Sequence, residues 1–479
     1  MKQVAAASPS EPLGLIALGR RSLVYALGGL AYKGVALLAL PILARLLSPA
    51  QLGLLDLAAV LAAIAGLVAV LGTDQGVAYL EPRAGFDSGL WGSALAIVTV
   101  VGGVLAVVVT MASGTFAVLL TGDAANGPMV VAAALYGWVA ALTATALNAI
   151  RLHATPRAYA VTSFMVVTAE MTAALTLALV IDAPVALMVL GWAGGALVVT
   201  VPLLLRFMPS FDRPKASVVR RLVAFGAPLV PTAAAWLVGD AWIRAMLAQQ
   251  GDLGALGEYG VAFRIASVLA LAVTGFGVAW HPYLYRSPAH TVGPRASRLL
   301  AVLVLVLGIG GSGLTAFSPE IIAVVAGPGY ERAREVVPAF SGGAVALGGF
   351  VLVSAVVGTR GSTRKIAGAA LLGMLAQVAF APMLIGAFGL AGAGLTSFLG
   401  YAAAVVILLA TERALLRSSS WRTLLAVVVS VAAIVLSAGL QGESLALRVA
   451  FMVGLAGLGA VILAATRTTR ARLEEGVDS

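Results

Sequence analysis

The sequence contains no cysteine and few charged residues. Among its 479 residues, Asp, Glu, Lys and Arg together make up 10%. The absence of thiols excludes disulfides, thiolate metal sites and cysteine nucleophiles. A soluble domain carries about a quarter charged residues. With 61% hydrophobic residues and a mean hydropathy of +1.03, the composition is instead that of a membrane protein.

Motifs of nucleotide and metal chemistry are also missing. There is no G-x-x-x-x-G-K-[ST] loop for binding ATP phosphates and no H-E-x-x-H metal motif, and the chain has three histidines. No polar segment is long enough to form a glycosyltransferase domain. We therefore expect no enzymatic activity, no cofactor and no metal site.

What the sequence does contain is apolar runs that recur along its whole length. A spanning helix needs roughly 20 apolar residues, whereas barrel strands alternate over about 10. The run lengths therefore predict an all-α polytopic membrane protein with about fourteen transmembrane helices. The expected spans are 22–46, 52–73, 88–113, 128–150, 157–180, 184–206, 221–248, 258–285, 296–317, 335–357, 365–387, 389–411, 422–440 and 445–466.

The basic residues give these spans an orientation. If the N-terminus is cytoplasmic, 23 of the 30 Lys and Arg fall in cytoplasmic segments and four in outer segments. This asymmetry follows the positive-inside rule and places both termini in the cytoplasm. The net charge of +10 is thus explained by membrane topology and does not indicate nucleic-acid binding. We expect the bacterial cytoplasmic (inner) membrane, with residues 1–20 as a cytoplasmic tail and not a cleaved signal peptide.

Two halves of the chain resemble each other. Residues 73–79 (TDQGVAY) match 274–280 (TGFGVAW), and Gln51-Leu52-Gly53 matches Ala255-Leu256-Gly257. Parallel repeats imply a pseudo-twofold axis along the membrane normal and a central cavity; the alternative is one irregular bundle. The expected organisation is a tail at 1–20, a six-helix lobe at 21–206, a cytoplasmic linker at 207–220, a second six-helix lobe at 221–412, two additional helices at 413–466 and a tail at 467–479.

Several stretches resemble a known family. The most specific is LARLLSPAQLG at 43–53, followed by GAPLVP at 226–231, Asp240 with Arg244, and GEYGVAFRI at 257–265. They resemble the polysaccharide biosynthesis and oligosaccharide flippase family of the multidrug/oligosaccharidyl-lipid/polysaccharide (MOP) exporter superfamily, over roughly residues 15–410. The resemblance implies a two-lobed, V-shaped transporter with twelve core helices that flips a lipid-linked sugar.

Ionisable residues inside spans are functional candidates because burying them in a bilayer is costly. Lys33 is the strongest, because it lies 12 residues after Arg21, about 18 Å along a helix. With the hydroxyls of Tyr25 and Tyr32 nearby, it is expected to bind a pyrophosphate or acidic sugar. The alternative is a structural ion pair with Glu170 or Asp240.

Other charged residues have weaker assignments. Arg264 is a second candidate to bind phosphate, with pairing to Glu258 as its alternative. Asp240 and Arg244 are four residues apart, which favours a local pair with a structural or gating role. Glu170 suits proton coupling or an interhelical contact. Asp56 and Asp74, near the ends of the second span, are expected to be solvated boundary residues.

Prolines in the first helix of each repeat are candidate hinges. Pro41 lies in the first span, and Pro228 and Pro231 lie in the seventh. Proline removes a helical hydrogen bond and bends the helix, which would let the lobes rock. The alternative is simple packing, since proline is common in membrane helices.

Together these observations predict a flippase that moves a lipid-linked oligosaccharide or polysaccharide precursor by alternating access. Its partners would be a polyprenyl-linked saccharide, the lipid bilayer and glycosyltransferases or a polymerase of the same pathway, with no nucleic acid. An ion-coupled multidrug exporter of the same fold is the first alternative. A membrane-embedded polysaccharide polymerase or ligase is the second, although such enzymes usually present a larger outer loop.

Overall fold

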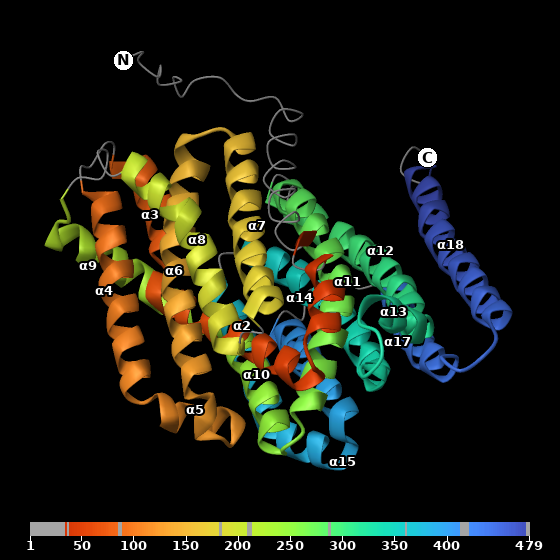
Figure 1. The fold of residues 1–479 in the computed structure, drawn as a ribbon. Helices are drawn as coiled ribbons and strands as arrows, with labels where there is room; N and C mark the ends of the chain where they lie inside the picture. Colours follow the sequence, from red (N-terminus) through yellow and green to blue (C-terminus); the bar gives the residue numbers. More distant parts are fainter. Residues whose placement is uncertain are drawn as a thin grey trace.

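The chain is described by a computed structural model that covers residues 34–35, 38–84, 89–181, 184–207, 213–285, 289–359, 362–411 and 421–475. Within these ranges it folds into helices and contains no strand. Eleven helices of the described part are long and apolar enough to cross a membrane. The protein is therefore an all-α multi-pass membrane protein, as its apolar runs predicted (Figure 1).

The first lobe precedes the central linker. Its described helices are α2 (Pro49–Val70), α3 (Thr73–Ala84), α4 (Leu90–Met111), α5 (Ser113–Thr121), η1 (Ala124–Asn126), α6 (Gly127–His153), α7 (Pro156–Ile181) and α8 (Val185–Phe207). Residues 38–46 are helical as well and lead into α2.

The second lobe follows the linker. Its described helices are α9 (Ala216–Gly226), η3 (Ala227–Leu229), α10 (Val230–Gln249), α11 (Leu253–Tyr285), α12 (Ala289–Ala316), α13 (Ser318–Val325), η4 (Glu331–Glu335), α14 (Val337–Thr359) and α15 (Thr363–Thr411). Two further helices, α17 (Trp421–Gly439) and α18 (Leu445–Glu475), complete the described chain. They pack against α12 of the second lobe, and α18 lies at the edge of the molecule (Figure 1).

The count of fourteen spans stays a prediction, although the structure explains part of the difference. The 49-residue α15 contains two expected spans, because Gly389 interrupts it with φ 55° and ψ −130°. The apolar stretch Thr423–Gly439 is shorter than the qualifying helices. Most of the first expected span lies outside the described residues.

The LSPAQLG part of the family-like stretch builds a helix start. The Ser48 hydroxyl accepts a hydrogen bond from the Gln51 backbone N–H, and the Gln51 side chain accepts one from the Ser48 N–H at 2.9 Å. This reciprocal capping box satisfies two backbone donors that the first helical turn leaves without partners. Pro49 follows at the first helical position, where a missing N–H costs nothing.

The inner end of the second span was predicted wrongly. Instead of ending near residue 73, α2 ends at Val70, and the chain continues as α3 to Ala84. Leu71 (φ 49°) and Gly72 (φ 68°) form a left-handed break between the two helices. The Thr73 hydroxyl then donates to the Val70 carbonyl at 2.7 Å, which helps to restart the helix.

The two lobes meet where the repeat predicted equivalent positions. Helices α2 and α11 cross at Gly53 and Gly257, so closely that a Cβ added to Gly53 would lie 2.6 Å from the Gly257 backbone nitrogen. Both helices start with a side-chain cap. Ser48 caps α2, and Asp252 caps α11 by accepting a hydrogen bond from the Ala255 N–H at 2.8 Å. This cap explains why α11 begins before residue 258. Equivalent residues in contact are expected on a pseudo-twofold axis.

The ends of the lobes that the sequence predicts to face outward, called the outer ends from here on, share one apolar core. It includes buried residues of α2, α6, α8, α10, α11, α14 and α15, together with the short α13 and η4 segments. Residues 318–335, between the expected ninth and tenth spans, are therefore folded against this core: Tyr330 is buried, and its hydroxyl donates to the Leu47 carbonyl at 3.1 Å. The inner ends meet through a smaller cluster between α3, α4 and α9.

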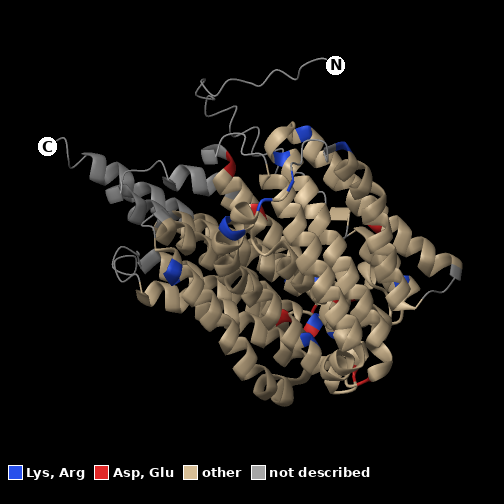
Figure 2. Cartoon of the chain, turned by 90° about the vertical axis from the view of Figure 1, so that its left-hand side faces the viewer, with Lys and Arg blue, Asp and Glu red and all other residues tan. Residues whose placement is uncertain are grey.

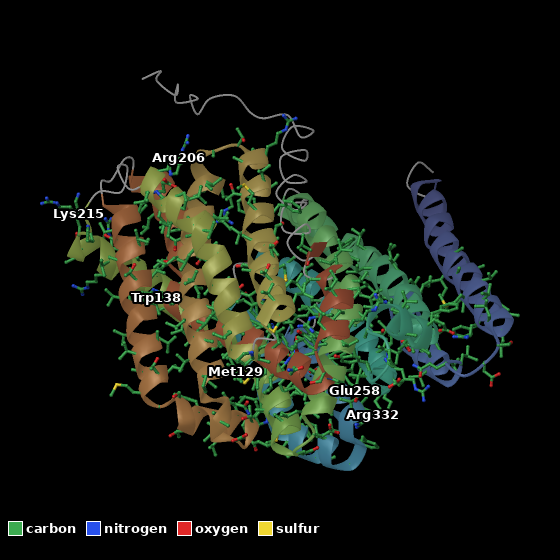
Figure 3. The ribbon with its side chains drawn as sticks, viewed as in Figure 1. Met129, Trp138, Arg206, Lys215, Glu258 and Arg332 are labelled. Atoms are coloured by element: carbon green, nitrogen blue, oxygen red, sulfur yellow. The ribbon has the colours of Figure 1, made fainter. Side chains whose placement is uncertain are left out.

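Figure 3 places Arg206 and Lys215 near one end of the bundle and Glu258 and Arg332 toward the other. Figure 2 also shows acidic and basic residues that meet within the bundle, away from the helix ends. The residues of that internal group form the site described next.

Candidate functional site

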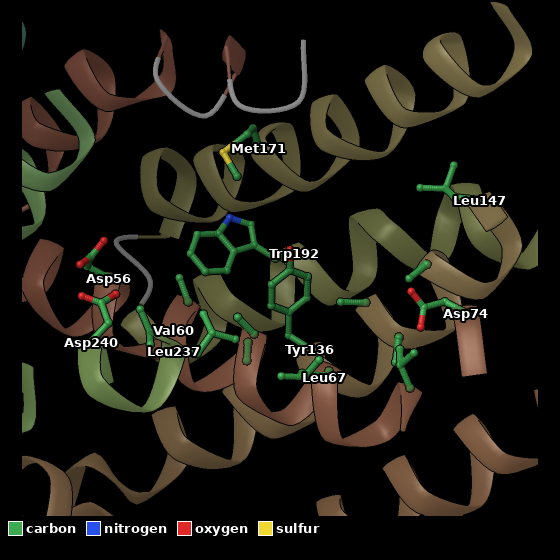
Figure 4. Close-up of a pocket in the computed structure, with 18 of the residues that line it drawn as sticks. Asp56, Val60, Leu67, Asp74, Tyr136, Leu147, Met171, Trp192, Leu237 and Asp240 are labelled. Atoms are coloured by element: carbon green, nitrogen blue, oxygen red, sulfur yellow. The ribbon is translucent and has the colours of Figure 1, made fainter. Parts of the chain in front are cut away.

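A cavity of about 750 Å³ lies between the two lobes. Helices α2, α6, α7 and α8 of the first lobe and α10 and α11 of the second provide its walls. Figure 4 shows Asp56 and Asp240 at one end, Asp74 at the other, and Tyr136, Met171 and Trp192 between them. The rings of Tyr136 and Trp192 lie 5.5 Å apart. The cavity thus has an aromatic middle and two polar ends.

The outer end of the cavity holds an ion cluster that joins the lobes. Asp56, on α2, forms two ion pairs. Its Oδ2 lies 2.7 Å from Arg244 Nε, and its Oδ1 lies 2.8 Å from Arg264 Nη2. Arg244 is fully buried and Asp56 is 5% exposed. A carboxylate between two guanidinium groups satisfies both of its oxygens, which is the condition for burying such charges at all.

The second lobe contributes the rest of the cluster from its own helices. Asp240 pairs with Arg244 one turn further along α10, and the Tyr259 hydroxyl donates to Asp240 Oδ1 at 3.4 Å. The hydroxyls of Tyr259 and Ser397 lie 2.9 Å apart, which connects α11 to α15. The Arg244 guanidinium also lies 5.0 Å from the Tyr259 ring centroid. Arg244 is therefore held on several sides by its own lobe.

Two donors of this cluster have no acceptor in the described part of the chain. Among the described residues, the buried Arg244 Nη2 and Arg264 Nη1 make no hydrogen bond. Both arginines line the cavity, and the Arg264 side chain is 21% exposed. Unsatisfied guanidinium N–H groups beside a cavity can donate hydrogen bonds to the oxygens of a phosphate or carboxylate, for which Arg geometry is well suited.

The inner end of the cavity is polar and more open. Arg151 donates to the Asn148 side-chain oxygen at 2.6 Å, and Asn148 donates to the Asp74 carbonyl at 3.3 Å. Tyr159 of α7 lies on the same wall. These groups can bind hydroxyls or water, and they are positioned by α3, α6 and α7.

The structure confirms one sequence assignment here and excludes one alternative. The pair predicted between Asp240 and Arg244 is present. Arg264 does not pair with Glu258 but with Asp56. Glu258 instead lies 3.6 Å from Arg332, on the outer side.

Asp56 was expected to be a solvated boundary residue, and this was wrong. It is buried at the crossing of α2 and α11, where its equivalent in the second repeat is Gly260. A Cβ on Gly260 would lie 3.0 Å from the Asp56 carboxyl carbon, so a side chain at 260 would crowd the Asp56 carboxylate. The repeat contained this signal, because aligning Gly53 with Gly257 also aligns Asp56 with Gly260, one turn before Arg264. Asp74, the other expected boundary residue, is partly buried and lines the cavity.

The remaining candidates are only partly placed. Lys33, Tyr25 and Tyr32 lie outside the described residues. Glu170 is on α7 and 2% exposed, so it is buried as predicted, and its coupling role stays a prediction.

The candidate hinges lie in two different settings. Pro41 is within the helical residues 38–46, whereas Pro228 lies in η3, the 3-10 turn between α9 and α10, and Pro231 is in the first turn of α10. The seventh span is thus broken where proline predicted a bend. A hinge role for the three prolines stays a prediction.

Beyond the cluster, a second set of polar contacts lies at the outer surface. Arg332 pairs with Asp252 at 3.0 Å, and the Arg45 side chain donates to the Val324 carbonyl at 3.1 Å. The Ala255 N–H and Arg332 lower the pKa of Asp252, while burial raises the pKa of Tyr330 to about 12. Within the described residues, no three His, Asp or Glu side chains gather as a metal site.

Solved structures share this fold at low sequence identity. A lipid II flippase, MurJ, in an inward closed conformation matches with a TM-score of 0.65 and 12% identity, covering 94% of this chain and 99% of that one. The multidrug transporter DinF-BH matches with a TM-score of 0.61 and 16% identity, covering 86% and 99%. An inward-facing multidrug resistance transporter of the MOP superfamily matches with a TM-score of 0.55 and 14% identity, covering 84% and 96%. The fold is thus the one found in these transporters.

The sequence itself matches one protein family. No curated protein matches the chain. The family described as polysaccharide biosynthesis protein matches residues 18–287, which is more than half of the chain and includes α2 through α11 with the whole ion cluster. The resemblance seen in the sequence is therefore confirmed, and this chain belongs to the polysaccharide biosynthesis protein family.

Proposed function

We propose that this protein is a flippase that moves an anionic, lipid-linked saccharide from the cytoplasmic to the outer leaflet by alternating access. The observation that carries the proposal is the pair of arginines at the outer end of the cavity. Arg244 and Arg264 each keep a buried N–H group for which the described residues provide no acceptor, and both line the cavity. A diphosphate headgroup supplies acceptors of the right charge and geometry.

The rest of the cavity suits a saccharide. The aromatic rings of Tyr136 and Trp192 offer apolar faces to sugar rings, and the inner end offers Asp74, Asn148 and Arg151 to hydroxyl groups. A lipid tail would stay in the bilayer between helices, because a cavity of about 750 Å³ has no room for a long polyprenyl chain as well.

The same proposal includes residues of the first span and of α7. Lys33 would add a third cation to the headgroup site, with Tyr25 and Tyr32 beside it, and Glu170 would take part in coupling to an ion. Pro41, together with Pro228 and Pro231 at the break in the seventh span, would absorb the movement of the lobes. We expect Lys33→Ala to abolish export of surface polysaccharide at normal protein abundance. Normal export by that variant would show that Lys33 does not contact the substrate.

A cellular experiment tests the proposal. Cells that lack the native chain would be complemented with wild-type protein or with Arg264→Gln, and surface polysaccharide and abundance of the membrane protein would be measured together. We expect the variant to be present at normal abundance and to export no polysaccharide. Full export by Arg264→Gln would contradict headgroup binding by this arginine.

A multidrug exporter is the second candidate, because the cavity also contains carboxylates. Asp56, Asp74 and Asp240 all line the cavity, and a cationic drug would pair with them. Two of the three are already neutralised by Arg244 or Arg264, which is why we prefer the anionic substrate. Efflux of fluorescent organic cations by cells that express the protein, with no change in surface polysaccharide, would favour the exporter.

A further inference from the structure

One residue carries the charged contact between the lobes at the cavity. Asp240 pairs with Arg244 from within the second lobe and the Tyr259 ring lies against it, whereas Asp56 reaches it from α2 of the first lobe. Asp56 also holds Arg264, on α11. Both bonds therefore cross from one lobe to the other, and both end on the same carboxylate.

Any opening of the outer end must break these two bonds. The outer end is closed where α2 packs on α10 and α11 and where Gly53 meets Gly257. Moving α2 away would leave Arg264 without its carboxylate and would leave Arg244 with Asp240 alone. An empty carrier would thus expose uncompensated charges in an apolar surrounding, which is strongly unfavourable.

An anion in the cavity changes this balance. The arginine N–H groups that lack acceptors lie beside those that hold Asp56, on the same two guanidinium groups. A headgroup bound there can replace the Asp56 oxygens one by one, so that the arginines keep a partner when α2 leaves. A ligand shifts a conformational equilibrium only by its different affinity for the two states, and this exchange provides such a difference.

We propose that Asp56 is a built-in competitor of the substrate headgroup: a diphosphate that takes over Arg244 and Arg264 releases α2 and lets the outer end open. The inference rests on the proposed function, because it assigns regulation to the same site. It also explains why the repeat is asymmetric here. Gly260, the equivalent of Asp56, leaves room at the axis for one carboxylate that both arginines share.

The first test measures the sign of an affinity change. Inorganic pyrophosphate is titrated by calorimetry into the purified full-length chain in nanodiscs of neutral lipid, in phosphate-free buffer. If Asp56 competes with the headgroup, Asp56→Asn binds pyrophosphate about 10-fold more tightly than wild type, a typical coupling between two linked equilibria. If Asp56 only positions the arginines, the variant binds more weakly.

A control variant separates competition from a general loss of negative charge. Asp252→Asn removes a carboxylate at the same outer end, but Asp252 faces Arg332 within the second lobe and does not line the cavity. Its affinity for pyrophosphate is expected to equal that of wild type. Tighter binding by both variants would show a long-range charge effect and overturn the competition.

The second test follows the outer opening in a chain that keeps Asp56. Because the protein has no cysteine, spin labels can be attached at Ala124→Cys of η1 and Ala387→Cys of α15, exposed positions on different lobes. We expect pyrophosphate to lengthen the distance between the labels, and Asp56→Asn to lengthen it without pyrophosphate. An unchanged distance with bound pyrophosphate would overturn the release of α2, even if Asp56→Asn failed to fold.

The two proposals fail in different ways. If neither wild type nor Asp56→Asn binds pyrophosphate, both the headgroup site and the competition are wrong. If wild type binds pyrophosphate, but Asp56→Asn binds it equally or more weakly, the headgroup site stands and the competition is wrong.

Discussion

The two ends of the interlobe contact are held together by different chemistry. At the outer end, Asp56 bridges Arg244 and Arg264. The same end contains the close crossing of Gly53 with Gly257 and the large apolar core that both lobes share. At the inner end, α3 and α4 meet α9 through a small apolar cluster that contains Val77 and Leu222, and the rings of Tyr79 and Phe225 stack at 4.6 Å.

This difference assigns different roles to the two ends. A charged contact responds to an anion, because the anion can replace one of its partners. An apolar contact has no charged partner that an anion could replace, so it changes only when the helices themselves move. We therefore expect the outer end to respond to substrate and the inner end to set the resting position. The following predictions are ordered from the largest expected effect to the smallest.

Arg244→Met should produce the largest loss of stability. It leaves Asp56 without one arginine and Asp240 without its ion pair, in a site where Arg244 is fully buried. Removing one member of a buried charge network costs about 3–5 kcal/mol. Thermal unfolding in detergent measures this loss. The matched control is Arg332→Met, a half-exposed partner of Asp252, which should cost below about 1 kcal/mol. Similar losses in both variants would contradict the buried network.

Leu222→Ala should loosen the inner end alone. Leu222 is fully buried against α3, and its side chain fills the space beside Gly76. Truncating a buried leucine costs about 2 kcal/mol or more. Solvent labelling of single cysteines introduced on α3 would report the change, with labelling of α5 at the outer end as the comparison. Equal increases at both ends would mean that the two contacts are not independent.

Gly257→Ala should prevent the outer crossing from closing. The added Cβ would overlap the Pro49 carbonyl oxygen, which is backbone and cannot move aside alone. Overpacking of this kind costs about 1–3 kcal/mol, and transport should be lost with it. Gly275→Ala on the same helix is the control, because no atom lies within 4 Å of its added Cβ. Loss of transport in both variants would contradict a specific role for the crossing.

Asp252→Ala should have the smallest effect. It removes the side chain that caps α11, which costs about 1 kcal/mol. Because the pKa of Asp252 is lowered in the folded protein by the Ala255 N–H and Arg332, its contribution is present above the ordinary aspartate pKa. It is lost as the pH falls through the lowered value. Unfolding of wild type and variant should thus differ near neutral pH and converge in acid; a constant difference would contradict the cap.

The sequence was sufficient for features that depend on local chemistry. Run length predicted membrane helices, and the spacing of Asp240 and Arg244 predicted their pair. Pro228 marked the break in the seventh span, because proline changes its own helix whatever surrounds it.

The sequence was insufficient to predict contacts between segments that lie far apart along the chain. The partners of Asp56 lie more than 180 residues away along the chain, on helices whose rotation no local pattern fixes. Asp56 was therefore placed in solvent, although the repeat aligned it with Gly260 next to Arg264. The break at Leu71 was also missed, because a left-handed leucine is set by contacts of its neighbours and not by its own preference.

The central claim is that the cavity arginines recognise a diphosphate headgroup during transfer, and leaflet transfer in proteoliposomes tests it most directly. A fluorescent saccharide on a polyprenyl diphosphate and the same saccharide on a neutral polyprenyl ether would be compared with wild-type protein and with Arg264→Gln. We expect transfer of the diphosphate lipid by wild type, its loss in Arg264→Gln, and no transfer of the neutral lipid by either. Equal transfer of both lipids by wild type, unchanged by Arg264→Gln, would contradict the account.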